Sequence, residues 1–274
     1  MHARNVLLAD RDAPGVYGRE DQFEAVVEQL TNAITDLVPR GAIEHLRFPP
    51  VVGRRTVERC GYLHSFPHLL GSVHTFTGDN RAHARMMEAV EAGQDWGSHQ
   101  TLSDVVLTPA ACYAVYPHLS GKLTDGGRCV DVESWCYRHE PTESAQRMRA
   151  FRMREYVRSG QPGIVRTWRD DWIVRAESFL RGLSLHPEVV VANDPFFGAG
   201  ARFMANSQRD QQLKFELLVD IEPFGSTAVM SCNYHGEHFG EVFGIQLPDG
   251  SAAHTACVGF GLERLALAIL ATRP

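Results

Sequence analysis

The chain has 274 residues, of which 44% are hydrophobic and 22% charged, a composition typical of a folded globular protein and unlike that of a disordered or fibrous one. Its formal net charge at pH 7 is −6, so the chain as a whole offers no electrostatic support for sequence-independent binding to nucleic acid. Because it has neither an apolar run long enough for a membrane span nor the apolar core of a secretory signal at its N-terminus, we expect a cytoplasmic protein without membrane contact.

Three segments have the periodicity of helices. From Glu20 to Val38, apolar residues recur at steps of three and four, which predicts an amphipathic helix packed on the body of the protein. Trp168 to Leu183 shows the same periodicity, with Trp172 and Leu180 on the apolar stripe, so we expect its polar face to be available to a partner. At the C-terminus, glycines 259 and 261 predict a turn that leads into a strongly apolar, buried helix.

Short apolar or alternating runs predict strands at Leu102–Leu107, Val189–Ala192 and Lys214–Ile221. Phe151–Arg158 is a further candidate strand, in which Phe151, Met153 and Glu155 would share one face. Long irregular segments separate these runs, and regular strand–helix–strand units are few. The pattern therefore favours an α+β fold, an antiparallel β-sheet with helices on one side, and we expect residues 1–274 to form a single domain.

The six cysteines are widely scattered and include no C-x-x-C pair, which argues against a disulfide scaffold or a zinc ribbon. Any metal site must therefore be assembled from distant segments. A lone cysteine is more often a small buried apolar residue, and this remains the interpretation for Cys60, Cys129, Cys136 and Cys232. Histidines 235 and 238 form a second possible metal pair, but the glycine between them favours a turn over a helical metal-binding face.

Between positions 138 and 158 the chain is rich in arginine, and this region also contains Glu140, Phe151 and Glu155. Such a cluster predicts either a site for an anion or a charged hairpin that simply faces water. The common nucleotide signatures are absent: there is no P-loop, and Gly198-Ala-Gly200 does not continue as a dinucleotide-binding fingerprint. The arginine-rich region is therefore the main candidate for phosphate binding.

Three motifs in a fixed order favour the binding site. Phe48-Pro49-Pro50 precedes a segment from 57 to 67; Tyr137-Arg138-His139-Glu140 precedes Arg147-x-x-x-Phe151; and Gly259-Phe-Gly-Leu-Glu-Arg264 opens the last helix. Together they resemble motifs 1, 2 and 3 of the class II aminoacyl-tRNA synthetases, over roughly residues 40 to 274. The resemblance implies the antiparallel sheet of that superfamily, and a homodimer formed through motif 1.

Within class II, the chain is most similar to the catalytic core of the atypical, methanogen-type seryl-tRNA synthetases, and closer still to the amino acid:[carrier protein] ligases. Where common seryl enzymes have T-x-E, this chain has Leu107-Thr-Pro-Ala-Ala-Cys112. The resemblance implies a Zn2+ ion held by Cys112, Glu155 and Cys257. Three protein ligands leave a fourth position open, the layout of a functional zinc site, and the neutral α-amine of an amino acid can fill it.

The resemblance also implies an ATP site with Mg2+ bridging the phosphates. Catalytic roles fall to Arg138 at the α-phosphate and Arg264 at the γ-phosphate. The other nucleotide contacts that it implies are Glu140 at the adenine amino group, Phe151 under the adenine ring, and Arg147 or Arg149 from the motif 2 loop. Ala228 stands where the seryl family usually has an acidic residue that helps to bind magnesium, so Glu216 or Asp220 would have to substitute. Ser231 and Asn233 are expected to border the pocket for the amino-acid side chain.

From this resemblance we expect activation of a small amino acid, glycine first and alanine second, to an aminoacyl adenylate, followed by transfer to the phosphopantetheine thiol of a carrier protein. The N-terminal region, a helical stretch of about 45 residues, is too short for a tRNA-binding domain, so no tRNA is expected. The helical insertion at about 166–185 is the expected docking surface, with Arg169, Arg175 and Arg181 as exposed contacts. The alternatives are another acceptor, a tRNA or a small amine, and an inactive paralogue that senses an amino acid or ATP.

Overall fold

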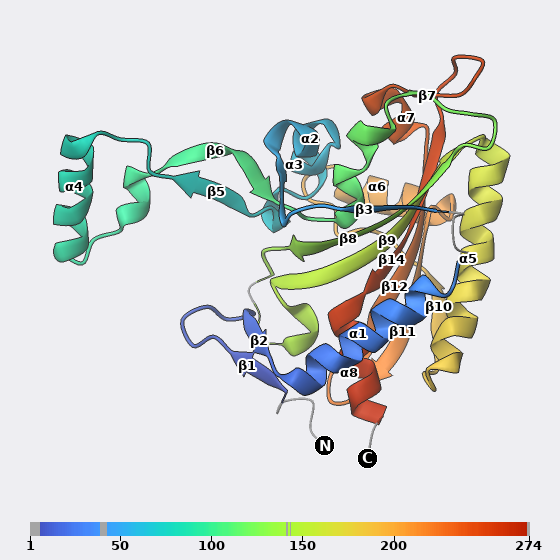
Figure 1. Cartoon of the computed structure of the whole chain (residues 1–274), viewed down its shortest axis with the longest axis horizontal. Helices are drawn as coiled ribbons and strands as arrows, with labels where there is room; N and C mark the ends of the chain where they lie inside the picture. Colours follow the sequence, from blue (N-terminus) through green and yellow to red (C-terminus); the bar gives the residue numbers. More distant parts are fainter. Residues whose placement is uncertain (1–5, 39–42, 141, 143, 273–274) are drawn as a thin grey trace.

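A seven-stranded β-sheet forms the centre of the computed structural model, which describes residues 6–38, 43–140, 142 and 144–272 (Figure 1). From edge to edge the strands are β10 (Glu188–Val191), β11 (Lys214–Ile221), β12 (Gly225–Gly236), β14 (His254–Gly261), β9 (Ala150–Gly160), β8 (Arg128–Tyr137) and β3 (Glu44–Arg47). All neighbours are antiparallel except β3, which pairs with β8 in parallel. The expected α+β fold with a mainly antiparallel sheet is confirmed, and the parallel edge strand is the exception.

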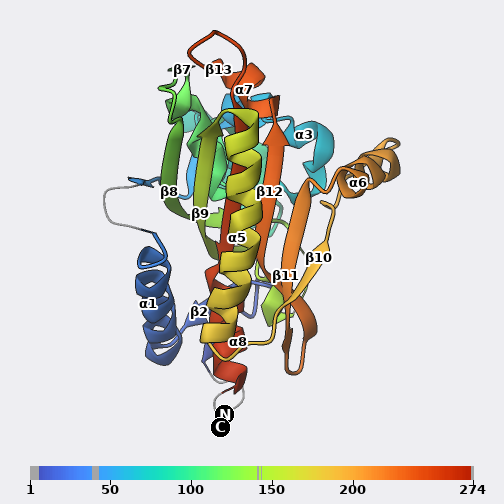
Figure 2. The same ribbon diagram turned by 90° about the vertical axis from the view of Figure 1, so that its right-hand side faces the viewer.

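Three helices cover one face of this sheet, as Figure 2 shows. They are α1 (Asp21–Thr35), α5 (Pro162–Gly182) and α8 (Leu262–Thr272). Phe23 of α1, Trp172 of α5 and Phe260 of β14 are fully buried in the core between helices and sheet. The three helices predicted from periodicity are confirmed, but α5 begins earlier, because Pro162 occupies the first turn, where a proline fits without losing a hydrogen bond.

The glycines before the last helix form no turn. Strand β14 runs through both Gly259 and Gly261, and α8 follows it directly at Leu262. The prediction of a glycine turn was therefore wrong. Gly259 passes close to other side chains instead: a Cβ atom there would lie 2.9 Å from Cε of Met153 and 3.3 Å from Oγ of Ser231, so a larger residue would have to displace the end of the Met153 side chain.

Short helices cover the opposite face of the sheet, over a second core that contains Tyr116, Phe239 and Phe243. The rings of Tyr116 and Phe239 are stacked with centroids 3.9 Å apart. These elements are α2 (Arg54–Arg59), α3 (Tyr62–Ser65), η2 (Pro67–Leu69), η4 (Ala111–Ala114), η5 (Tyr116–Leu119) and α7 (His238–Phe243). Two further short helices lie elsewhere: η6 (Ala145–Arg147) contacts α8, and α6 (Ala201–Asp210) lies beside the β10–β11 side of the sheet (Figure 2). No helix in the described ranges combines the length and apolar character needed to span a bilayer.

Smaller sheets lie at the periphery. A hairpin near the N-terminus lies beside the start of β9, and a projecting arm extends away from the body (Figure 1). The hairpin is β1 (Leu7–Ala9) and β2 (Tyr17–Arg19); the arm carries α4 (Asn80–Glu91) and η3 (Trp96–His99) on the sheet of β4 (Val51–Gly53), β6 (Thr101–Leu107) and β5 (Ser72–Thr75); β7 (Gly121–Lys122) pairs with β13 (Ile245–Gln246). The strands predicted from alternation are all present, within one residue or two at each end.

The predicted docking helix has less exposed charge than its sequence suggests. Arg169 of α5 is only 2% exposed, because its guanidinium donates to the carbonyl of Gln212 and lies over the ring of Phe215. Arg175 and Arg181 are exposed, as expected. The prediction of three exposed arginines was therefore wrong for Arg169, since an arginine beside an apolar stripe can bury its stem and satisfy its head group on a neighbouring segment.

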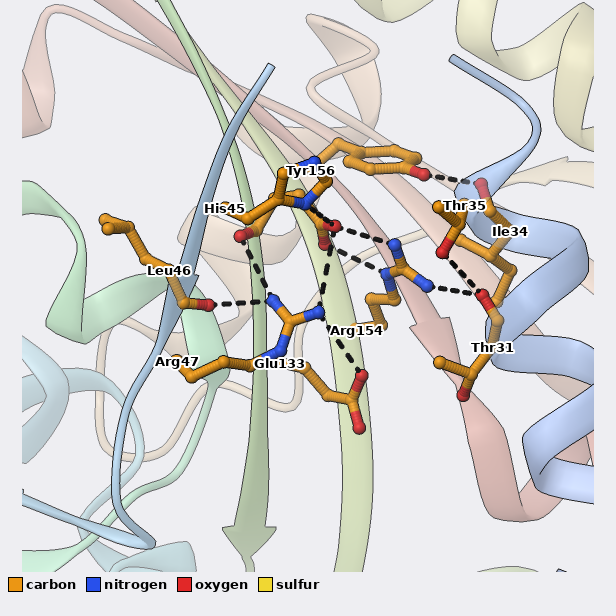
Figure 3. Close-up of polar contacts among 10 residues, drawn as sticks. Thr31, Ile34, Thr35, His45, Leu46, Arg47, Glu133, Arg154 and Tyr156 are labelled. Carbon is orange, nitrogen blue, oxygen red and sulfur yellow. Dashed lines mark hydrogen bonds and ion pairs between the residues drawn. The ribbon is translucent and has the colours of Figure 1, made fainter. Parts of the chain in front are cut away.

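A buried ion pair joins the middle of the sheet to the helix layer. Arg154 on β9 and Asp131 on β8 are 1% and 0% exposed, and the guanidinium binds the carboxylate through Nε and Nη2 at 2.9 and 2.6 Å. Figure 3 shows the surrounding contacts: Arg154 also donates to the carbonyl of Thr31 at the end of α1, and His45 on β3 reaches the same carboxylate at 2.8 Å. The pair thus connects four elements.

We predict that Arg154→Met lowers the free energy of unfolding by about 3–5 kcal/mol, because removal of one partner leaves the Asp131 carboxylate buried without its main counter-charge. Chemical denaturation followed by circular dichroism measures the change. Arg181→Met is the matched control, since the pair of Arg181 with Glu177 is exposed and such pairs contribute roughly 0–1 kcal/mol. Equal losses in the two variants would contradict the prediction.

Candidate active site

A cavity of about 250 Å³ lies on the face of the sheet opposite α5. Strand alternation explains its position, since Tyr156 of β9 packs on Trp172 of α5 while the neighbouring Glu155 points to the other side. Most of the predicted site residues line this cavity: Cys112, Arg138, Glu140, Phe151, Glu155, Glu216, Ser231, Asn233, Cys257 and Arg264. The structure therefore gathers residues from seven separate segments around one space.

The cysteines and the carboxylate predicted to bind metal lie together. One ligand atom from each of Cys112, Glu155 and Cys257 falls within 4.8 Å of the other two, and all three residues are buried. Strand pairing explains part of this, because Cys257 lies opposite Val157, two residues from Glu155. Glu155 Oε1 accepts the backbone N–H of Ala111 at 2.8 Å, which brings η4, and with it Cys112, to the strand.

The group of Cys112, Glu155 and Cys257 concentrates acidic side chains away from water. Burial and the neighbouring Cys257 raise the pKa of Glu155 to about 8. The Cys112 thiol hydrogen-bonds to the sulfur of Cys257 and so holds the pKa of Cys257 well below its ordinary value, with His235 adding to the effect. A divalent cation would offset most of the negative charge of the deprotonated group, and two thiolates with one carboxylate are a donor set that suits zinc. The residues therefore fit the metal that the resemblance implies.

Two polar side chains support the sulfur of Cys257. Nδ2 of Asn233 donates to it at 3.4 Å and to Oγ of Ser231 at 3.3 Å, and Nε2 of His235 lies 3.6 Å from the same sulfur. Such N–H donors to a ligand atom orient it and stabilise its thiolate form. Asn233 was predicted to border the pocket for the amino-acid side chain, and the structure also places it against a candidate metal ligand.

The other cysteine and histidine candidates lie elsewhere. Cys136 is 2% exposed in the second core and is not part of the metal-binding group, so its interpretation as an apolar core residue is consistent with the structure. His238 faces the carbonyl of Cys60 at 3.4 Å, whereas His235 points to Cys257. Among the described residues these two histidines therefore do not form a shared site.

The other end of the cavity is cationic. The guanidinium of Arg138 lies 5.5 Å from the centre of the Phe151 ring, and its Nε donates to the carbonyl of Pro109 at 3.1 Å. Arg264 is held by two backbone carbonyls, that of Gln146 at 2.7 Å and that of Ala228 at 2.9 Å. Burial and the like charge of Arg138 lower the pKa of Arg264, a strain that an anion between the two arginines would relieve.

Two predicted nucleotide contacts lie outside this cavity. Arg147 is exposed and forms an ion pair with Glu140 at 3.0 Å. Arg149 turns toward the N-terminal hairpin, where its backbone N–H donates to the carbonyl of Gly15 at 2.8 Å. Neither arginine is brought to the cavity wall, so Arg138 and Arg264 are the two predicted phosphate contacts that the described structure places there.

A polar cluster in the cavity wall was missed by the sequence reasoning. Lys214 on β11 forms ion pairs with Asp194 at 2.5 Å and with Glu216 at 3.0 Å, and Gln208 of α6 donates to the Asp194 carboxylate at 2.8 Å. The alternation of Lys214 and Glu216 along a predicted strand was the only available signal. Asp194 could not have been found, because it reaches the cavity through the loop between β10 and α6. Asp220, the second magnesium candidate, does not line the cavity.

Known proteins resemble the chain in sequence. It is 45% identical over 274 residues to "Amino acid--[acyl-carrier-protein] ligase 1" of Bradyrhizobium diazoefficiens, an alignment that covers 99% of this chain and 84% of that protein. No protein-family model matches the chain.

Solved structures share the fold. The seryl-tRNA synthetase of M. kandleri, in complex with the tRNASec of A. aeolicus, superposes with a TM-score of 0.80 at 22% identity over 98% of this chain and 55% of that one. The seryl-tRNA synthetase of Pyrococcus horikoshii, complexed with ATP, gives a TM-score of 0.68 at 14% identity over 94% of this chain and 53% of that one. The chain thus spans about half the length of either synthetase, and the α+β class II synthetase-like architecture is confirmed.

Proposed function

The chain belongs to the amino acid–[acyl-carrier-protein] ligase family, and we propose that it activates a small amino acid with ATP and transfers it to the phosphopantetheine thiol of a carrier protein. One observation carries the proposal: a single cavity has the Cys112, Glu155 and Cys257 group at one end and Arg138 and Arg264 at the other. This polarity suits two substrates bound side by side: an amino acid with its amine at the first end, and ATP with its triphosphate at the second.

In the first step, a carboxylate oxygen of the amino acid attacks the α-phosphorus of ATP, and pyrophosphate leaves. Arg138 faces the α-phosphate and Arg264 the γ-phosphate, where fixed cations stabilise the charge that develops. The ring of Phe151 supports the adenine, and Glu140 accepts from its amino group. A magnesium ion with the nucleotide would spread the phosphate charge further, and Glu216 is the acidic residue on the cavity wall that can face it.

Zinc held by Cys112, Glu155 and Cys257 would supply an open position for a neutral amine. The chain's own residues then limit which amino acid fits. His235 and Phe239 line the cavity beside the metal group, with their rings 4.9 Å apart, and Tyr113 lines it as well. Three rings around the amine leave room for a small side chain, which supports glycine first and alanine second.

In the second step, the thiol sulfur of the carrier attacks the carbonyl carbon of the adenylate, AMP leaves, and the thiol proton passes to solvent. The thiol must reach the cavity, and α5 lies across the sheet from it (Figure 2). Helix α6 is a better docking surface than α5, because its Gln208 binds Asp194 in the cavity wall.

The exposed side of α6 has the chemistry of an interface. Phe203 is 78% exposed and Phe197, in the preceding loop, is 57% exposed, which is unusual for large apolar side chains. Arg202 and Arg209 of α6 are exposed as well. An aromatic anchor flanked by arginines suits an acidic protein partner, and carrier proteins are generally acidic.

We predict about one zinc ion per chain in purified protein, lost in Cys112→Ala, because two ligands do not hold the metal against exchange with buffer. Inductively coupled plasma mass spectrometry of the two proteins measures this. Cys60→Ala, a change at a buried cysteine outside the group, is the matched control and should keep its metal. Stoichiometric zinc in Cys112→Ala, or none in active wild-type protein, would overturn the assignment.

We predict that Arg264→Ala lowers amino-acid-dependent ATP–pyrophosphate exchange by about 10²–10³-fold, the effect of losing one fixed charge contact to the transition state. The fold should survive, since Leu265 and Leu267 anchor α8 in the core. Exchange across the amino acids, with glycine and alanine first, also tests substrate choice. A folded wild-type protein without exchange for any amino acid would favour the inactive, sensing paralogue.

We predict that labelled glycine or alanine is transferred to holo-carrier but not to apo-carrier or total tRNA. Phe203→Ala should slow the transfer about fivefold or more, the loss expected for an aromatic interface anchor, while leaving pyrophosphate exchange unchanged. Arg181→Glu on α5 is the control and should transfer normally. Efficient charging of tRNA, or an equal rate with apo-carrier, would show that the acceptor is wrong; a transfer defect in Arg181→Glu alone would return the docking surface to α5.

A further inference from the structure

The N-terminal hairpin lies against the parts of the chain that bind the nucleotide in the proposed function. We propose that Arg19, the last residue of β2, is a positioning residue for ATP. It holds the loop at 145–150 and the first turn of α8 in one arrangement: the helix turn carries Arg264, and the carbonyl of Gln146 in the loop accepts a hydrogen bond from that arginine. The proposal deepens the proposed function, because it concerns the same nucleotide site.

The guanidinium of Arg19 binds both segments at once. Its Nη2 donates to the carbonyl of Ala150, where β9 begins, at 3.0 Å and lies 3.3 Å from the carboxylate of Glu263 in the first turn of α8. The side chain is only 9% exposed, and the same nitrogen lies 3.6 Å from the sulfur of Met148. An arginine exposed on the surface would not make this set of contacts, so the position of the Arg19 side chain is fixed by its neighbours.

The carboxylate that Arg19 reaches, that of Glu263, also binds Arg152. Glu263 is 2% exposed and accepts both the backbone N–H of Arg152 at 2.5 Å and its Nε at 2.8 Å. Arg152 continues to Glu24 of α1 through two hydrogen bonds, and the guanidinium groups of Arg19 and Arg152 lie 4.6 and 5.0 Å from the ring of Trp135. These contacts fix the backbone next to two residues of the proposed nucleotide site: Phe151 directly precedes Arg152, and Arg264 directly follows Glu263.

The hairpin holds the loop at a second point. The carbonyl of Gly15 accepts the backbone N–H of Arg149 at 2.8 Å. Gly15 has a φ of +87°, and a Cβ atom there would lie 3.0 Å from the carbonyl oxygen of Thr142, so only glycine allows this approach. The turn of the hairpin and its end at Arg19 therefore hold two neighbouring residues at the end of the loop, Arg149 and Ala150.

The position of the loop sets the position of Arg264. The carbonyl of Gln146 in this loop accepts from Nε of Arg264 at 2.7 Å, and Glu263 fixes the backbone next to Arg264. Loss of Arg19 removes one hydrogen bond from the carbonyl of Ala150 and one cation from the Glu263 carboxylate. We therefore expect Arg264 to be less well aligned for the triphosphate, while the Cys112, Glu155 and Cys257 end of the cavity, which has no contact with the hairpin among the described residues, keeps its arrangement.

The test compares Arg19→Met and Arg19→Lys with the wild-type protein and with Arg128→Met. Arg128 is a matched control, because it also forms an ion pair, with Glu44, and donates to a backbone carbonyl, but at the β3 edge of the sheet. Isothermal titration calorimetry with ATP and Mg2+ measures nucleotide binding without amino acid or acceptor. Pyrophosphate exchange then gives the KM for ATP and for the amino acid separately, and thermal unfolding reports stability.

We expect Arg19→Met to weaken ATP binding by about tenfold, the effect of one hydrogen bond to a charged group, and to raise the KM for ATP but not that for the amino acid. Arg19→Lys should recover most of the affinity, because an ammonium group can still reach Glu263. Unchanged ATP affinity in Arg19→Met, an equal rise in both KM values, or the same loss in Arg128→Met would overturn the proposal. ATP binding without any exchange in the wild type would instead count against the proposed function and leave the role of Arg19 open to the calorimetric result.

Discussion

The buried pair of Arg154 and Asp131 ties the sheet to its helix layer, and the cavity on the opposite face depends on it. Arg154 and Glu155 are consecutive residues of β9, so their side chains point to opposite faces of the sheet. The hydrogen bonds that hold Arg154 on the helix side therefore also fix the direction of Glu155 on the cavity side. The same strand continues with Phe151 and Met153 in the cavity and Arg152 on the helix side. One strand thus supplies the buried anchors of the fold and part of the site at the same time.

The cavity has two ends of opposite character, and each end is satisfied differently. The acidic groups of Cys112, Glu155 and Cys257 are buried close to one another, and burial raises the pKa of Glu155 to about 8. At the other end, Arg138 and Arg264 face the same space with their guanidinium groups partly held by backbone carbonyls. A bound cation at the first end and a bound anion at the second would offset these like charges, which is why the proposed function places zinc at one end and the phosphates of ATP at the other.

Three segments, α5, α6 and the N-terminal hairpin, differ in the structure from what their sequences suggested. Helix α5 has the length and the charge of a partner-binding helix in the sequence, yet its buried stripe and Arg169 make it a wall of the core. Helix α6 is short and polar in sequence, but it lies at the cavity wall with Phe203 exposed. The N-terminal hairpin, which the sequence showed only as part of a short leading region, contacts the start of β9 and Glu263 in the first turn of α8, next to Arg264.

The sequence by itself predicted three helices, four strands, the α+β class and a set of site residues most of which line the cavity, because hydrophobic periodicity reports which face of an element is buried and three ordered motifs indicate the superfamily. Arg138, Phe151 and Arg264 follow from those motifs, and Glu155 follows from the resemblance to the atypical seryl-tRNA synthetases and the carrier-protein ligases. Only the tertiary structure decided which charged residues leave the site and which enter it. Arg147 and Arg149 stand in the motif yet lie outside the cavity, whereas Asp194 and Lys214 line it without any motif. The physical reason is that periodicity describes one element at a time, while the direction of a long charged side chain is set by the hydrogen-bond partners that distant segments bring to it.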